Sequence, residues 1–307
     1  MKREFLTQFM ERLIVELERE QRDGTAHVYQ STLKRLKKFA NGREVSFKQL
    51  TPEWLSQFER KLLADQLKWN SISTYMRTLR SVYNQAVERG IASYIPRLFS
   101  RVHTGIDCQV KRAVSSTSVI LPLPSSPQQA PTIALTITLH AFLFLLRGMP
   151  FVDLAFLRKC DLQGNVVVYH RHKTRRKLTV VVCPEAMAII EKYQDMYPDS
   201  PYLLPIIQDS KQDEYRQYSK MLRLRNYRLR QVGYFLKIRE QLSTYVARHT
   251  WATTALRQNY NSSLICDAMG HSSVKVTETY FQRYREDEVN QLNNALVAFV
   301  LSKKVSY

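Results

Sequence analysis

A histidine and a tyrosine near the C-terminal end stand at a spacing that suggests chemistry. The segment GHSSVKVTETYFQRY, residues 270–284, places His271 directly after a glycine and nine residues before Tyr280. Upstream, Arg248 lies in TYVARHTWATTAL, among apolar residues of a predicted helix, where a guanidinium needs an anion or a carboxylate as its partner. Lys173 stands at the tip of a predicted hairpin, HRHKTRRK. These residues suit one reaction if a second arginine joins them.

Arg147, at the end of a predicted helix, is the candidate for that second arginine. Together the residues suit transfer of a phosphodiester to tyrosine. Two guanidinium groups can neutralise the non-bridging oxygens, and a lysine can protonate the departing 5′ oxygen. A phenol, with a pKa of about 10, serves both as nucleophile and as leaving group. His271 is expected to support the nucleophile or the phosphate. Because we find no clustered carboxylates that would hold Mg²⁺, we expect neither a metal nor a cofactor.

Each of these residues also has a purely structural explanation. Helices often carry His and Tyr for packing, and a helix-terminal arginine such as Arg147 can simply meet the helix dipole. Within the hairpin, Arg175, Arg176 and Lys177 compete with Lys173, because a small error in register would bring one of them to the tip.

The composition favours a polyanionic partner. The 307 residues include 46 Lys and Arg against 27 Asp and Glu, a formal net charge of +19, which suits nucleic acid or an anionic membrane surface. The most apolar run, residues 133–146, is interrupted by polar residues and is shorter than the ~20 residues of a membrane span, so we expect no membrane partner. The four cysteines form no CxxC pair, and the N-terminus is not a signal peptide. Reduced thiols and a cytoplasmic location are therefore predicted.

The elements that must position these residues fall into two groups. Apolar periodicity predicts four N-terminal helices, beginning near residues 3, 25, 51 and 71. A Pro- and Ser-rich segment, residues 111–131, is predicted to be a linker. Beyond it we expect an apolar helix ending at Arg147, a helix over 150–161 and two Val-rich strands joined near 174–176. Further helices are predicted over 184–197, 211–241, 244–260, 262–269, 273–284 and the C-terminal end.

The predicted fold is therefore mainly α. It has an N-terminal four-helix domain over residues 1–110 and a mostly helical domain with a small antiparallel β element over residues 132–307. Basic residues of the N-terminal helices and of the hairpin are predicted to line a DNA backbone, although a solvated helix face explains any single one of them equally well. They are Lys34, Arg35, Lys38, Arg77, Arg80, Arg175 and Arg176.

Three motifs make the chain resemble a known family. RHTWATTAL, the following MGHSS and then Tyr280 resemble the tyrosine recombinases, the phage-integrase family, over nearly the whole chain. RGMPFVDLAFL and YVARHTWAT resemble most the branch found on Bacteroidetes mobile elements and DNA invertases. The resemblance implies that the N-terminal helices form a core-binding domain and that Lys173 is the catalytic lysine.

The function that the resemblance implies is site-specific recombination of duplex DNA through a 3′-phosphotyrosyl intermediate. The two domains would clamp the DNA, and a homotetramer on two sites would exchange strands through a Holliday junction, with accessory DNA-bending proteins as further partners. The C-terminal helix would dock either on a neighbouring subunit or on its own domain.

Two positions depart from the family pattern. Pro150 occupies the usual place of an arginine, and we expect Arg147, three residues upstream, to replace that arginine. Tyr245 stands where the family commonly has a histidine; its phenol can donate to a phosphate oxygen but is a poor base near neutral pH. His249 is expected to pack, and Asp153 to hold the nearby backbone or an arginine.

Two other functions stay open. One is a DNA-binding accessory protein on the same fold, inactive because of Pro150. The other is a type IB topoisomerase, against which the short chain without a large N-terminal clamp argues. The sequence does not distinguish integration, excision and inversion.

Overall fold

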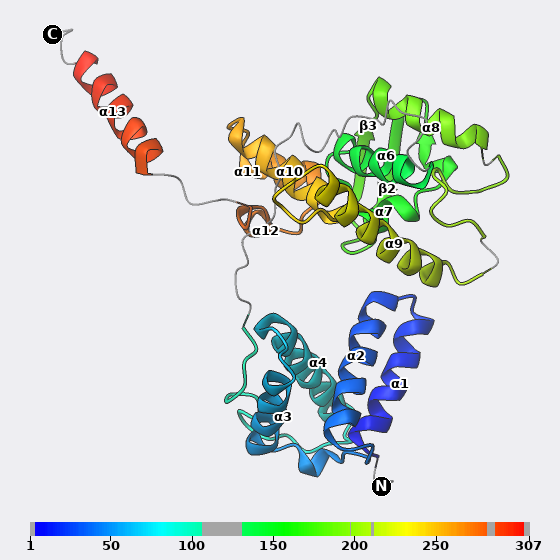
Figure 1. Ribbon diagram of the computed structural model, residues 1–307. Helices are drawn as coiled ribbons and strands as arrows, with labels where there is room; N and C mark the ends of the chain where they lie inside the picture. Colours follow the sequence, from blue (N-terminus) through cyan, green and yellow to red (C-terminus); the bar gives the residue numbers. More distant parts are fainter. Residues whose placement is uncertain (1–3, 106–130, 197, 210–211, 281–285, 304–307) are drawn as a thin grey trace. The chain divides into compact units, whose positions relative to one another are not determined.

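The chain divides into two compact units, residues 1–109 (unit 1) and 110–307 (unit 2) (Figure 1). The structure is a computed structural model, and it describes residues 4–105, 131–196, 198–209, 212–280 and 286–303. The predicted linker, residues 111–131, lies outside the described residues except for its last residue.

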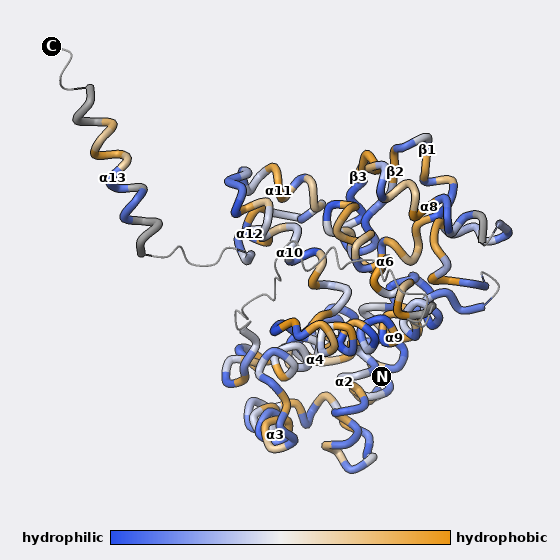
Figure 2. The backbone as a smooth tube through the Cα atoms, turned by 45° about the horizontal axis from the view of Figure 1, so that its top comes forward, coloured by the Kyte–Doolittle hydropathy of each residue, from blue (hydrophilic) through white to orange (hydrophobic). Residues whose placement is uncertain are grey.

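Unit 1 is built from four α-helices within residues 4–105. They are α1 (Leu6–Arg19), α2 (Asp23–Phe39), α3 (Pro52–Ala64) and α4 (Trp69–Glu88), with a 3-10 turn, Phe47–Gln49, before α3. As predicted, α3 begins at a threonine cap, because the Thr51 hydroxyl accepts a hydrogen bond from the Trp54 amide. Apolar and polar stretches alternate along these helices (Figure 2), and the apolar side chains, such as Phe9, Phe58 and Ile72, meet in a fully buried core.

Unit 2 surrounds a small antiparallel sheet with helices. Its elements are α6 (Pro131–Leu145), α7 (Phe151–Ala155), β1 (Leu162–Gln163), β2 (Val166–His170), β3 (Lys177–Val181), α8 (Pro184–Met196), α9 (Glu214–Phe235), α10 (Thr244–Arg257), α11 (Ser262–Met269), α12 (Val274–Glu278) and α13 (Glu286–Lys303). The strand order is β1-β2-β3, and the register pairs His170 with Lys177 beside the β2–β3 turn. Val167 and Val180 turn one face of the sheet into a core shared with α6, α8 and α9.

The predicted fold class, mainly α with a small antiparallel sheet, is confirmed. Two local expectations were wrong, and one short strand was missed. The helix predicted from Pro150 stops at Ala155, and a 3-10 turn follows in which the Asp161 carboxylate binds the Arg158 amide in place of a helical partner. A third strand, β1, joins the predicted pair. The helix predicted over 273–284 ends at Glu278, so Tyr280 lies in the turn that follows α12.

The predicted apolar core helix is α6. Among the described residues, no helix is both long enough and apolar enough to cross a membrane. Cys160, Cys183 and Cys266 are free thiols, and Cys108 lies outside the described residues.

A buried histidine in α6 makes the stability of unit 2 sensitive to acid. His140 is 1% exposed, and neither ring nitrogen has a hydrogen-bond partner in the described part of the chain. Burial lowers the pKa of His140 from 6.5 to about 4. As the pH falls from 6.5 towards 4, the unfolded chain gains a proton that the folded chain does not, so the free energy of unfolding falls.

We therefore expect His140 to reduce the free energy of unfolding by about 2 kcal/mol between pH 7 and pH 5. Urea unfolding of wild type and His140→Leu gives the free energy of unfolding of each protein at both pH values. The contribution of His140 is the change, from pH 7 to pH 5, in the difference between these two free energies. An equal pH dependence in both proteins would contradict the assignment.

Candidate active site

Arg248 lies at the centre of the site, on α10, and is 2% exposed. Its Nη1 donates to the Gly148 carbonyl oxygen at 2.7 Å, and its Nη2 donates to the Met269 carbonyl oxygen at 2.8 Å. These partners are neutral backbone groups and not the carboxylate that the sequence suggested as one option. Burial lowers the pKa of the guanidinium, and the nearby Arg171 lowers it further. Such a buried, positively charged position is suited to receive an anion.

Tyr280 is brought to Arg248 by the turn after α12. Its side chain is 4% exposed, and its ring stacks on the His271 ring with centroids 5.8 Å apart and planes at 11°. The His271 Nδ1 atom is hydrogen-bonded to the Thr277 hydroxyl at 2.8 Å, so α12 fixes the imidazole against the phenol. The His249 ring lies on another side of the phenol, with centroids 5.2 Å apart. The structure thus brings together the arginine, histidine and tyrosine of the sequence motifs.

The Tyr280 hydroxyl starts as a poor nucleophile. Burial raises its pKa well above the ordinary value, and the neighbouring Tyr245 raises it further. The neighbouring Arg248 guanidinium opposes both influences. Tyr245 lies near the hydroxyl, but it is itself 49% exposed, and its ring packs edge-on against His249 with centroids 4.7 Å apart. Ionisation of Tyr280 therefore depends on the cation beside it.

The segment between α6 and α7 packs directly on α10. Arg147 and Gly148 both adopt the left-handed conformation, with φ of 56° and 66°. A Cβ atom at Gly148 would lie 3.0 Å from the Arg248 Cα atom, so this close approach requires glycine. Arg147 is half-buried, and its Nη1 donates to the Thr179 carbonyl oxygen of β3 at 3.3 Å. Arg147, the predicted replacement for the missing arginine, thus directly precedes Gly148, whose carbonyl oxygen binds Arg248.

Lys173 lies in the turn between β2 and β3, as predicted, and is exposed. Its neighbours Arg175 and Arg176 are also exposed, but Arg176 is engaged within the protein. Its Nη1 donates to the His271 carbonyl oxygen at 3.2 Å, and its Nη2 donates to the Asp267 carboxylate at 2.9 Å. These two bonds attach the hairpin to α11 and to the residue that follows Gly270, and the Arg176 side chain stays 42% exposed.

A second buried arginine at the site, Arg171, was missed by the sequence analysis. It is 7% exposed, and its Nε donates to the Asp153 carboxylate at 2.9 Å. Its Nη1 donates to the carbonyl oxygens of Met269 at 2.8 Å and of Gly270 at 3.1 Å. Because Arg248 donates to the same Met269 oxygen, the two donor nitrogens are at most twice 2.8 Å apart. The expectation that Asp153 holds an arginine agrees with this contact.

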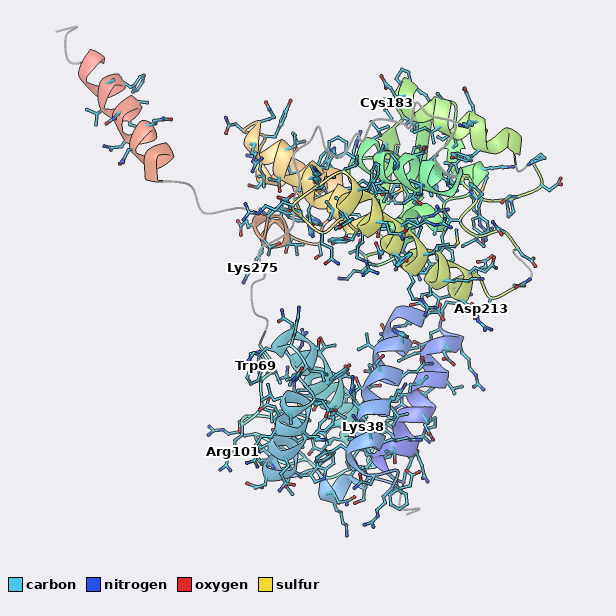
Figure 3. All side chains as sticks on the ribbon, in the orientation of Figure 1. Lys38, Trp69, Arg101, Cys183, Asp213 and Lys275 are labelled. Atoms are coloured by element: carbon cyan, nitrogen blue, oxygen red, sulfur yellow. The ribbon has the colours of Figure 1, made fainter. Side chains whose placement is uncertain are left out.

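The predicted DNA-binding residues of unit 1 divide into two sets. On α2, Lys38 (labelled in Figure 3) and Arg35 share the Asp65 carboxylate, at 2.9 Å and 3.5 Å, so part of their charge is compensated. Arg77 of α4 is half-buried, and its Nε donates to the Ser73 carbonyl oxygen at 3.3 Å. The remaining two, Lys34 and Arg80, are exposed on α2 and α4. A cationic surface is therefore present on both helices.

No group of three or more His, Cys, Asp and Glu side chains in the described residues has an arrangement that could hold a metal ion.

Comparison with known families gives two matches that together span most of the chain. Residues 5–100 match the phage integrase SAM-like domain, and residues 129–292 match the phage integrase family. The chain belongs to the phage integrase family. It is a tyrosine recombinase, an enzyme that transfers DNA strands by transesterification at specific sites.

Solved structures share the integrase fold. The Tn1549 transposon integrase in complex with transposon right end DNA is 13% identical, with a TM-score of 0.67 over 96% of this chain and 100% of that chain. A lambda integrase dimer bound to a COC′ core site is 12% identical, with a TM-score of 0.63 over 92% of this chain and 98% of that chain. No curated protein matches the sequence.

Proposed function

We propose that this recombinase cleaves duplex DNA with Tyr280 as its nucleophile. The observation that carries this assignment is the buried Tyr280 phenol beside the Arg248 guanidinium, with His271 stacked on the phenol. In the proposed step, the Tyr280 oxygen loses its proton to water and bonds to phosphorus. The bond from phosphorus to the 5′ oxygen breaks, which leaves a 3′-phosphotyrosyl link.

Three further residues complete the proposed chemistry. Arg147 joins Arg248 on the non-bridging oxygens, and Lys173 protonates the departing 5′ oxygen. Tyr245, in contact with Tyr280, donates a hydrogen bond to a phosphate oxygen, as its half-exposed position permits. These assignments match the needs of a transition state that gathers negative charge and expels an alkoxide.

The proposed partner is double-stranded DNA, bound as a homotetramer on two sites, with accessory bending proteins where the site requires them. Exposed cations on α2 and α4 and the net charge of +19 support DNA binding. The Tn1549 and lambda integrase structures of the same fold contain DNA. On α13, Leu296 and Val297 are 55% and 48% exposed, which supports docking of this helix on a neighbouring subunit. A cytoplasmic location and a Bacteroidetes mobile element as source belong to the same proposal.

A suicide DNA substrate tests this function, because its nick lets the short fragment with the freed 5′ hydroxyl diffuse away, which traps the covalent complex. Wild type is expected to form an SDS-resistant adduct only on DNA that carries its recombination site. A protein that binds the DNA without any adduct would be an accessory protein. Relaxation of supercoiled plasmid lacking the site would instead indicate a topoisomerase.

DNA binding is expected to weaken steeply with salt. Each phosphate neutralised by a lysine or arginine contributes a slope of about −0.9 to the plot of log affinity against log salt concentration. Titration of a labelled duplex at several salt concentrations measures the slope. An affinity that stays constant from low to moderate salt would exclude electrostatic binding to the DNA phosphates.

Arg147 is expected to contribute substantially to cleavage. Losing one preorganised donor at a developing charge typically costs on the order of 10²–10³ in rate, so Arg147→Ala is expected to slow single-turnover cleavage by at least ~10²-fold. Arg147→Lys is expected to recover part of this loss, because it keeps the charge but not the two-pronged geometry. If a correctly folded Arg147→Ala protein cleaves at the wild-type rate, the cation that joins Arg248 on the phosphate would have to come from the hairpin.

A further inference from the structure

The turn that carries Lys173 is attached to the rest of the site by the residues at its base. The Arg171 amide donates to the Arg176 carbonyl oxygen at 2.9 Å, and the Arg175 amide donates to the Arg171 carbonyl oxygen at 2.8 Å. These two bonds close the turn, so the position of Arg171 largely determines the position of Lys173. The exposed lysine itself lies within this closed turn.

One carboxylate holds the first two residues of the turn. Asp153 of α7 is fully buried, and its Oδ2 atom accepts from the Arg171 side chain at 2.9 Å. Its Oδ1 atom accepts from the His172 amide at 2.8 Å. The His172 ring also stacks on Phe156, with centroids 5.2 Å apart and planes at 19°. The backbone directly before Lys173 is thus fixed to the segment that follows Arg147 and Gly148.

The Arg171 guanidinium connects this turn to the other half of the site. Its Nη1 uses both of its hydrogens on the Met269 and Gly270 carbonyl oxygens, directly before His271. The approach is close, because a Cβ atom at Gly270 would lie 3.0 Å from the Arg171 Cδ atom. Since Arg248 also donates to the Met269 oxygen, the lysine turn and Arg248 share one fixed reference point.

We propose that Arg171 is a positioning residue that holds the Lys173 ammonium at the 5′ leaving oxygen. The inference rests on the proposed function, in which Lys173 gives that oxygen its proton as the bond from phosphorus to the 5′ oxygen breaks. Three of the five N–H donors of Arg171 already bind protein groups, which suits a residue that orients the site. Without Arg171, the turn loses its attachment to both Asp153 and the Met269–Gly270 carbonyls, and the ammonium is no longer held in place.

The test replaces the leaving group. A suicide substrate with sulfur in place of the bridging 5′ oxygen at the scissile position releases a thiolate, which needs no proton because thiols are far more acidic than alcohols. Single-turnover cleavage of the oxygen and sulfur substrates is measured for wild type, Lys173→Ala, Arg171→Ala and Arg171→Lys. Lys192→Ala, which removes an exposed cation from α8, controls for the loss of positive charge.

On the oxygen substrate, Lys173→Ala and Arg171→Ala are both expected to lose at least ~10²-fold in rate, the usual contribution of a general acid. On the sulfur substrate both are expected to come within about 10-fold of wild type, because the missing proton no longer matters. Arg171→Lys keeps the charge beside Asp153 but cannot bind both carbonyls, so it is expected to show the same rescue with a smaller defect. It carries the test alone if Arg171→Ala does not fold.

Two results would overturn the inference. If Lys173→Ala recovers on the sulfur substrate while the Arg171 variants stay slow, Arg171 acts on the phosphate or the fold and not through the lysine. Wild-type cleavage of the oxygen substrate by Arg171→Ala would also exclude it. Failure of Lys173→Ala itself to recover would reject Lys173 as the acid, and the role of Arg171 would fall with that part of the proposed function.

Discussion

Replacing Tyr280 with phenylalanine is expected to abolish covalent attachment to DNA while leaving DNA affinity nearly unchanged. The substitution removes one hydroxyl and keeps the ring that stacks on His271 and contacts His249. Since the hydroxyl is the proposed attacking group, its removal is expected to eliminate the covalent step. Adduct formation on a suicide substrate and affinity for the intact duplex, measured on the same protein, separate chemistry from binding.

Tyr260→Phe is the matched control for the nucleophile, because Tyr260 is an exposed tyrosine just after α10. It is expected to form the adduct at the wild-type rate. An SDS-resistant adduct in Tyr280→Phe would place the nucleophile elsewhere, with Tyr284, outside the described residues, as the first candidate.

The second large effect is expected at Arg248. Its guanidinium lies beside Tyr280 and is held by two backbone carbonyls, so it is oriented before DNA arrives. Arg248→Lys keeps a positive charge but loses the fork that binds both carbonyls. Single-turnover cleavage is expected to fall by 10²–10³-fold, the usual cost of losing a preorganised donor. Lysine is preferred to alanine, because alanine would leave the buried Gly148 carbonyl oxygen without this donor, at about 1–3 kcal/mol, whereas the Met269 oxygen would keep its bond from Arg171.

A buried arginine outside the site provides the control for this experiment. Arg225 of α9 is 3% exposed, and its Nη1 donates to the Thr136 hydroxyl at 2.9 Å, outside the proposed catalytic machinery. Arg225→Lys makes the same replacement of a buried guanidinium by an ammonium group. The folded variant is expected to cleave DNA at near the wild-type rate. Equal losses in the two variants would mean that Arg248 acts through stability alone.

The sequence predicted the helices well because their apolar residues repeat with the helical period over three or more turns. It failed where a local contact or a short element decides. The helix expected over 150–161 is only α7, which ends at Ala155, because the Asp161 side chain binds the Arg158 amide and favours a tight turn. The two-residue strand β1 is too short to show any alternation. Tyr280 was expected on a helix, and α12 stops two residues before it.

At the site, the motifs around Arg248, His271 and Tyr280 predicted residues that the structure brings together. Arg171 was missed because HRHKTRRK offers several cations with nothing in their types to separate them. One signal was present. Val167, Tyr169 and Arg171 alternate along β2 and just beyond it, and all three are buried, so the period of the strand places Arg171 on the inner face. The pairing with Asp153 depends on tertiary structure and has no sequence pattern.

The atoms that orient the arginines of this site are largely backbone oxygens. Gly148 and Met269 bind Arg248, while Met269 and Gly270 bind Arg171. Substitution of Met269 by other amino acids would reveal only the packing of its side chain. The backbone carbonyl that binds the two arginines would remain in every variant that keeps the path of the chain. Its contribution becomes measurable only by chemical synthesis or by semisynthesis that replaces the amide by an ester, which weakens the carbonyl as an acceptor. Part of the orientation of the catalytic groups thus depends on backbone atoms, which amino-acid substitution does not remove.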